Sequence, residues 1–238
     1  MKILESCSVH SSWEAPLKKA LESIDPKYLE QLSDSTDWLP GRNKIFSAFS
    51  LPKNDVKYIL FGESPYPRAT SANGYAFWDA NVKEIFSSTG LSKEVNRATS
   101  LRNFIKLLLI CEGRIQENNL SQSAIAAMDK IHLISTLDSL FENLIQQGFL
   151  LLNASLVLSD MNKTKEARYW QPFIQSILRS LHQEKPKLIL FGKIAEMILS
   201  MPDAAYFDYI NAVHPYNLSF IHDKKIQAFF KPMHLLGS

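Results

Sequence analysis

Cysteine is scarce in this sequence, and its scarcity excludes two kinds of protein. Of the 238 residues, only Cys7 and Cys111 are cysteines. Two thiols cannot build a disulfide framework, and they cannot supply the four thiolates that ligate an iron–sulfur cluster. Such a chain suits a reduced compartment, so we expect a cytoplasmic protein.

Net charge and long apolar runs are also lacking. The 26 lysines and arginines are nearly balanced by 24 aspartates and glutamates, which leaves a net charge of +2. No global field therefore attracts nucleic acid, and a surface that binds it must be a local patch.

No run approaches the ~18 apolar residues of a membrane span. Residues 1–12 hold only the short apolar pair Ile3-Leu4, far below a signal-peptide core. We expect a soluble chain without a membrane partner.

Glycine-rich nucleotide loops are missing too. Gly192-Lys193, ahead of a predicted helix, is the only hint of a phosphate loop, and it lacks the further glycines of the nucleotide fingerprints. A sugar-nucleotide or dinucleotide enzyme is therefore a distant alternative. The sequence shows no internal repeat, low-complexity tract or obvious linker. We predict a single domain over residues 1–238, with an N-terminal helical extension over roughly residues 1–40.

Four short apolar runs predict buried strands. They are continuous rather than alternating in polarity, as expected when both faces of a parallel sheet are covered. These runs span residues 56–61, 149–152, 188–191 and 210–213. Helical periodicity marks residues 13–24, 101–111, 137–145, 173–181 and 194–201. The alternation predicts an α/β fold, with three α/β/α layers around a central four-stranded, mainly parallel sheet.

Chemically useful side chains follow three of the four predicted strands. In open α/β sheets the ligand lies outside the carboxyl ends of the strands, so a site is expected in these loops. The three loops span residues 62–67, 153–155 and 214–219.

These loops carry a family resemblance. Val-Lys-Tyr-Ile-Leu-Phe-Gly-Glu-Ser-Pro-Tyr at 56–66 and Asn-Gly-Tyr-Ala-Phe at 73–77 resemble two segments of family I uracil-DNA glycosylases. Those segments are the water-activating loop, typically Gly-Gln-Asp-Pro-Tyr-His, and the base-stacking segment, typically Gly-Leu-Ala-Phe. The resemblance continues, in the family's order, through residues 100–103, 148–153, 169–173 and 214–219. It covers most of the chain from about residue 45 to residue 219. Each motif alone is commonplace, so the signal is their order and their position after the predicted strands.

The resemblance implies a role for each residue of the base pocket. An enzyme that acts on a base must flip it from the stack, grip it and support the charge that develops. Phe77 would stack on the flipped base, Asn153 would read the polar edge of uracil, and Tyr66 would fill the space that a thymine methyl needs. His214 would donate a hydrogen bond to the uracil oxygen that becomes anionic. Leu218 would be the wedge that occupies the vacated stack.

Each role has a structural alternative. Phe77 could be a core aromatic, and Asn153 a turn or cap residue. His214 could be a hydrogen-bonded structural residue, and Leu218 a packed loop residue. Tyr66 could only pack its loop.

Position 64 departs from the family, which has an aspartate there that orients the attacking water. Ser64 is the candidate catalytic residue with His214, but its hydroxyl is neutral and a poor general base. Glu63 is a candidate for the base-binding loop. We do not expect it to replace the missing aspartate, because neighbouring side chains on extended backbone project to opposite sides.

Candidate DNA contacts lie outside the pocket. Leu218 and Ser219 belong to the wedge loop, which reads His-Pro-Tyr-Asn-Leu-Ser where the family has His-Pro-Ser-Pro-Leu-Ser. Lys165 and Arg168, together with Lys163, form a short basic cluster that could meet phosphates without reading sequence. Equally, such a run could be a solvated surface.

Three hypotheses for function follow. The first is a DNA-repair glycosylase that hydrolyses the bond to uracil or a related flipped base in DNA, as a monomer and without a metal, a cofactor or a lysine Schiff base. The second is a DNA-binding protein that recognises such a base and no longer hydrolyses it. The third is a repair or replication adaptor on the same scaffold.

Overall fold

The computed structural model describes residues 9–159 and 161–237. The expectations for Cys7 and for the pair Ile3-Leu4 lie outside these residues. The chain divides into two compact units, each built from two stretches of sequence. Unit 1 comprises Met1–Ala80 and Gly148–Ile210, and unit 2 comprises Asn81–Gln147 and Asn211–Ser238. The single domain over residues 1–238 stays a prediction.

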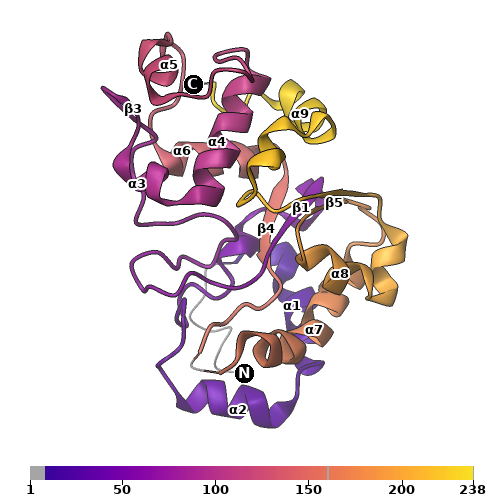
Figure 1. Cartoon of the computed structure of the whole chain (residues 1–238). Helices are drawn as coiled ribbons and strands as arrows, with labels where there is room; N and C mark the ends of the chain where they lie inside the picture. The colour runs from indigo at the N-terminus through magenta and orange to yellow at the C-terminus, as the bar shows by residue number, and fades with distance from the viewer. Residues whose placement is uncertain (1–8, 160, 238) are drawn as a thin grey trace. The chain divides into compact units, whose positions relative to one another are not determined.

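A four-stranded sheet organises unit 1 (Figure 1), in the order β4-β1-β5-β6. Its strands are β1 (Tyr58–Gly62), β4 (Phe149–Asn153), β5 (Lys187–Phe191) and β6 (Tyr209–Ala212), the last of which runs on into unit 2. The central strand β1 pairs in parallel with β4 and with β5. The predicted α/β fold with a four-stranded parallel sheet is therefore confirmed.

The strands of the sheet differ in how many of their residues are buried. Every residue of β4 is buried, and so are all but the first of β1 and of β5. The prediction of a continuous buried run is wrong for β6, where Tyr209 and Asn211 are exposed. In β6 only alternate side chains are covered, whereas β4 at the other edge of the sheet is buried throughout.

Helices accompany the strands in the described part of unit 1 (Figure 1). The helices of this unit are α1 (Glu14–Glu22), α2 (Pro26–Asp34), α7 (Lys163–Ser180) and α8 (Ile194–Leu199). Helix α1 packs against α7, and α8 contacts β5. The predicted helix over 13–24 is confirmed, and that over 194–201 is confirmed with a slightly earlier end.

Two helix predictions in unit 1 need correction. Asp25 and Pro26 begin α2, a helix that no range predicted from periodicity includes, because the Asp25 carboxylate accepts from the backbone N–H of Lys27. The helix predicted from residue 173 begins at Lys163, capped by the Asn162 side chain, and continues through Pro172. Buried Glu166 and Trp170 hold the part that the prediction omitted.

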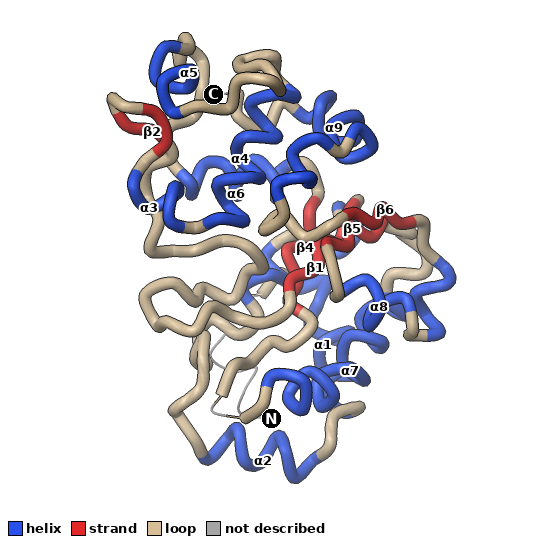
Figure 2. The backbone as a smooth tube through the Cα atoms, viewed as in Figure 1, coloured by secondary structure: helices blue, strands red, loops and turns tan. Residues whose placement is uncertain are grey.

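Unit 2 is mainly helical (Figure 2). Its helices are α3 (Lys93–Arg97), α4 (Thr99–Cys111), α5 (Gln122–Ala127), α6 (Leu137–Gln146) and α9 (Lys224–Phe230). A small antiparallel pair, β2 (Phe86–Ser87) and β3 (Gly90–Leu91), accompanies them. The two stretches of sequence that form unit 2 pack together. The rings of Phe230 and Phe104 meet edge to face with centroids 5.3 Å apart, and the Asn143 amide donates to the Leu235 carbonyl at 2.9 Å. The helices predicted over 101–111 and 137–145 are confirmed.

None of the helices in the described part of the chain combines the length and the apolar character needed to cross a membrane.

Candidate functional site

The carboxyl ends of β1 and β4 bring Gly62 and Asn153 opposite each other. The pairing continues beyond the strands, because Ala154 N–H donates to the Gly62 carbonyl at 2.8 Å and Ser155 N–H donates to the Glu63 carbonyl at 3.0 Å. Asn153 is only 3% exposed. A Cβ on Gly62 would overlap the Asn153 side-chain oxygen and come within 2.9 Å of the Ala76 Cβ. The missing side chain at position 62 thus leaves the room in which the Asn153 amide lies.

Tyr66 and Phe77 are tied together beside this edge of the sheet. The Tyr66 hydroxyl donates to the Phe77 carbonyl at 3.1 Å, and the Phe77 ring meets Phe191 edge to face at 6.0 Å. Ala76 N–H donates to the Leu151 carbonyl at 3.0 Å, which fixes the segment to β4. Phe77 has a φ of 63°, a left-handed conformation that bulky residues rarely adopt. Such strain is typical of functional sites, where surrounding contacts maintain it.

A buried carboxylate that the sequence analysis missed lies near Tyr66. Asp79 is 4% exposed, and its Oδ2 lies 3.4 Å from a guanidinium nitrogen of Arg68. Burial raises the pKa of Tyr66, and the negative charge of Asp79 raises it further, while Arg68 opposes them. Tyr66 therefore stays a neutral hydrogen-bond donor at ordinary pH. The available signal was an acid within the apolar run Ala-Phe-Trp-Asp-Ala at 76–80.

The loop after β1 presents the residue that departs from the family. Ser64 is half-buried, next to exposed Glu63 and buried Pro65. Ser64, Tyr66, Phe77 and Asn153 all belong to unit 1. Their proposed roles stay predictions, as does that of Glu63.

His214, Leu218 and Ser219 belong to unit 2, where a tight turn follows β6. Asn217 N–H donates to the His214 carbonyl at 2.9 Å, and Tyr216 N–H donates to His214 Nδ1 at 3.1 Å. A backbone N–H can only donate, so Nδ1 must carry a lone pair and the ring proton sits on Nε2. In this arrangement Nε2–H is the hydrogen-bond donor of the ring. A developing oxyanion is stabilised by such a group.

Asn103 on α4 anchors the same turn, a function that the sequence analysis did not recognise. Its amide donates to the Pro215 carbonyl at 2.7 Å, and it also lies 3.5 Å from the Tyr216 carbonyl. Asn103 is 2% exposed. Because these bonds reach the backbone beside His214, Asn103 is a positioning residue for the turn. Its place in the motif at 100–103 was the only signal.

The candidate DNA contacts are all exposed. Leu218 opens the short 3-10 helix Leu218–His222 and is 61% exposed, and Ser219 beside it is exposed too. Lys165 and Arg168 lie on the first turns of α7, exposed on either side of buried Glu166.

Metal ligands do not gather among residues 9–159 and 161–237, where no group of three or more His, Cys, Asp or Glu side chains could hold an ion.

The fold of the chain resembles that of a known solved structure. No family model matches the chain. The structure of mimivirus uracil-DNA glycosylase is similar with a TM-score of 0.56 and 17% identity, over 87% of this chain and 69% of that one. At this identity the likeness concerns the fold alone, which is that of a uracil-DNA glycosylase.

Other known proteins are similar to the chain in sequence as well. The UNG structure from Nitratifractor salsuginis is 43% identical with a TM-score of 0.96, covering 100% of this chain and 96% of that one. The uracil-DNA glycosylase of Campylobacter hominis is 28% identical over an alignment of 224 residues, which covers 89% of this chain and 81% of its relative. That of Lactococcus lactis subsp. cremoris is 28% identical over an alignment of 217 residues, which covers 88% of this chain and 85% of its relative. The chain belongs to the uracil-DNA glycosylase superfamily of DNA glycosylases.

Proposed function

We propose that the chain hydrolyses the N-glycosidic bond of uracil, or of a closely related flipped base, in DNA. The observation that carries the proposal is the buried Asn153 amide in the space that Gly62 leaves open. A buried amide at the carboxyl edge of a parallel sheet suits recognition of a polar base edge. The fold and the names of the relatives support the same activity.

Each step of the reaction falls to a different part of the chain. As the bond between the base and C1′ of the sugar breaks, the bonding electrons pass to the base. The oxygen of water then adds to C1′, and the proton that this water loses neutralises the base anion. Asn153 and Tyr66 would hold the base, Phe77 would cover its face, and His214 Nε2–H would donate to the oxygen that gains charge. Ser64 would position the attacking water through its hydroxyl, without acting as a strong base.

Partners and setting follow from the same proposal. The partner is uracil-containing or otherwise damaged DNA, and the reaction needs no metal or cofactor. We place the protein in the cytoplasm as a monomer; its two cysteines support a reduced compartment.

One observation favours a second function. Position 64 holds a hydroxyl where the family has a carboxylate, and losing a general base typically costs about 10²–10⁴ in rate. A chain that keeps the pocket and lacks this group could recognise a flipped base without cleaving it. An adaptor on the same scaffold is the remaining alternative.

Uracil release by the native chain and by two variants separates these functions. The substrates are single- and double-stranded oligonucleotides with one uracil, and abasic sites are cleaved with alkali. We expect slow release by the native chain, and release about 10²–10⁴-fold faster after Ser64→Asp restores a carboxylate. Ser64→Ala should lower the native rate about 2- to 10-fold, because one hydrogen bond to water is lost.

Each contrary result identifies a different function. If neither the native chain nor Ser64→Asp releases uracil, and both bind uracil DNA more tightly than thymine DNA, the second function is correct. If no DNA binds at low salt, only the adaptor remains. If Ser64→Asp lowers the rate, Ser64 serves a chemistry different from the one proposed.

A further inference from the structure

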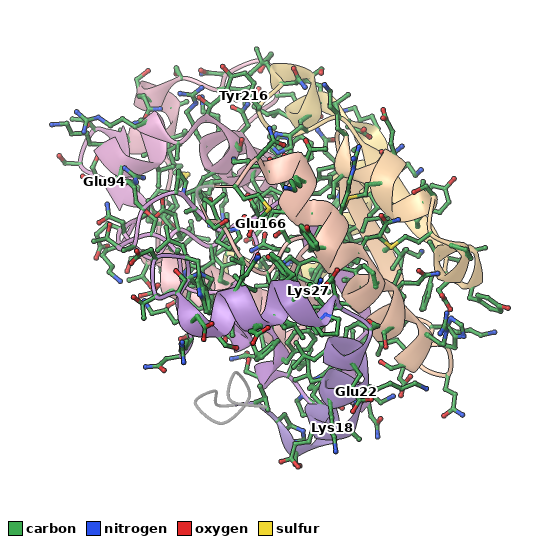
Figure 3. The ribbon with its side chains drawn as sticks, turned by 90° about the horizontal axis from the view of Figure 1, so that it is seen from below. Lys18, Glu22, Lys27, Glu94, Glu166 and Tyr216 are labelled. Carbon is green, nitrogen blue, oxygen red and sulfur yellow. The ribbon has the colours of Figure 1, made fainter. Side chains whose placement is uncertain are left out.

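Two large apolar side chains stand in solvent on the turn after β6. Tyr216 is 68% exposed and Leu218 is 61% exposed. Figure 3 labels Tyr216 among the side chains. The family resemblance gives a role to Leu218 alone, because Tyr216 occupies a position where the family has serine. An exposed tyrosine at this position therefore needs its own explanation.

The backbone that carries Tyr216 is held rigidly. Its N–H donates to His214 Nδ1, and the adjacent Pro215 carbonyl accepts from buried Asn103 at 2.7 Å. Pro215 is buried on one side of the exposed segment, and Phe220 is fully buried on the other. A side chain on a fixed backbone loses little further entropy when it binds. Tyrosine adds a large, flat contact with only two side-chain torsions.

Tyr216 is also close to the group expected to serve the flipped base. Consecutive Cα atoms are about 3.8 Å apart, so the Cα atoms of Tyr216 and His214 are separated by at most about 7.6 Å. Bases along one strand repeat every ~3.4 Å. If His214 Nε2 meets a flipped base, Tyr216 is therefore within reach of the nucleotides beside it.

We propose that Tyr216 is a base-stacking residue through which the site binds single-stranded DNA. The inference rests on the proposed function, in which this turn faces DNA. In a duplex, the neighbours of a flipped nucleotide remain in the helix, and an aliphatic wedge such as Leu218 fills the gap. In a single strand the bases are separated from one another, and an aromatic face binds them by stacking. Tyr216 and Leu218 thus serve different forms of the substrate.

The test measures dissociation constants by fluorescence anisotropy. The probes are a labelled oligonucleotide with one 2′-fluoro-2′-deoxyuridine, which resists cleavage, and the matching duplex. Tyr216→Ala should weaken single-strand binding about 5- to 100-fold, and duplex binding much less. Leu218→Ala should show the opposite preference. Tyr216→Phe keeps the ring and should bind a single strand within about 2-fold of the native chain.

Two controls separate stacking from other effects. Tyr206→Ala removes another tyrosine, 62% exposed, and should leave both dissociation constants unchanged. Salt titrations should give the native slope for Tyr216→Ala, because a stacking residue releases no counterions. Thermal unfolding of each variant confirms that the fold is retained.

Failure of the inference is distinct from failure of the proposed function, since binding is measured without cleavage. Equal losses on single and double strands, or none for Tyr216→Ala, overturn the stacking role. If the native chain releases no uracil while Tyr216→Ala still loses single-strand affinity, the proposed function fails and the inference stands. If the native chain binds neither probe, the inference is wrong.

Discussion

At the scale of single residues, the absence of a side chain at Gly62 decides how Asn153 is held. The Asn153 amide lies in the space that a Cβ would take, and Ala76 closes the other side at 2.9 Å from that position. Neither the strand backbone nor Ala76 can retreat easily, because Ala76 N–H is bonded to the Leu151 carbonyl. A methyl group at position 62 would therefore displace the Asn153 amide.

Gly62→Ala should lower uracil release about 10- to 100-fold, since a displacement of about 1 Å in a positioned group can cost 10²-fold. Release is measured under single-turnover conditions, and thermal unfolding checks that the variant folds. A rate equal to the native one would show that the Asn153 amide is not confined as described.

A double variant shows which residue carries the effect. If Gly62→Ala acts through Asn153, adding it to Asn153→Ala should cause little further loss. Multiplied losses would mean that position 62 acts independently of the Asn153 amide.

Single residues also show how far the sequence could predict the site. The positions of Gly62, Asn153 and His214 at or just beyond the ends of strands followed from apolar runs, because the end of a run is visible in local sequence. Asp79 and Asn103 did not, because their partners depend on tertiary contacts. Asn103 bonds to Pro215, 112 positions away, and no periodicity encodes that contact.

At the scale of elements, a buried carboxylate joins α7 to α2. Glu166 is 1% exposed and is labelled on α7 in Figure 3. It accepts from the Tyr28 hydroxyl and from Ser159 N–H, both at 2.9 Å. Trp170 donates in turn to the Tyr28 oxygen at 2.9 Å. Burial raises the pKa of Tyr28, and Glu166 raises it further, so the phenol remains a donor.

Glu166→Gln should destabilise the protein by about 1–3 kcal/mol, because the amide NH₂ would face a donor and leave it unsatisfied. For a chain of this size that lowers Tm by about 3–10 °C. Glu22→Gln makes the same chemical change at an exposed position of α1 and should leave Tm unchanged. Equal Tm values for both variants would show that the Glu166 contacts contribute nothing.

The same elements explain two errors in the helices predicted for unit 1. Asp25 and Pro26 follow the end of α1 and cap α2, and the local sequence does not show that a second helix begins there. Helix α7 tolerates Pro172 because burial of Trp170 and Phe173 on either side compensates for the lost backbone bond. In α7, tertiary burial overrode local propensity.

At the scale of the whole molecule, a net charge of +2 leaves DNA attraction to local clusters. Lys165→Ala and Arg168→Ala should each weaken binding to uracil and thymine DNA alike, and reduce the salt slope by about 1. Lys18→Ala, an exposed change on α1, is the control and should leave the slope unaltered. Unchanged slopes for the α7 variants would assign these cations to the solvated surface.

The division of the chain into two interleaved units has a consequence for its synthesis. Strand β1 pairs with β4, which lies about 90 residues further along, and the intervening stretch builds part of the other unit. At about 5–20 residues per second, β1 leaves the ribosome about 5–20 s before its partner. During that interval an apolar strand has both hydrogen-bonding edges open, so a nascent chain depends on chaperones or on fast translation of residues 63–148 to avoid aggregation.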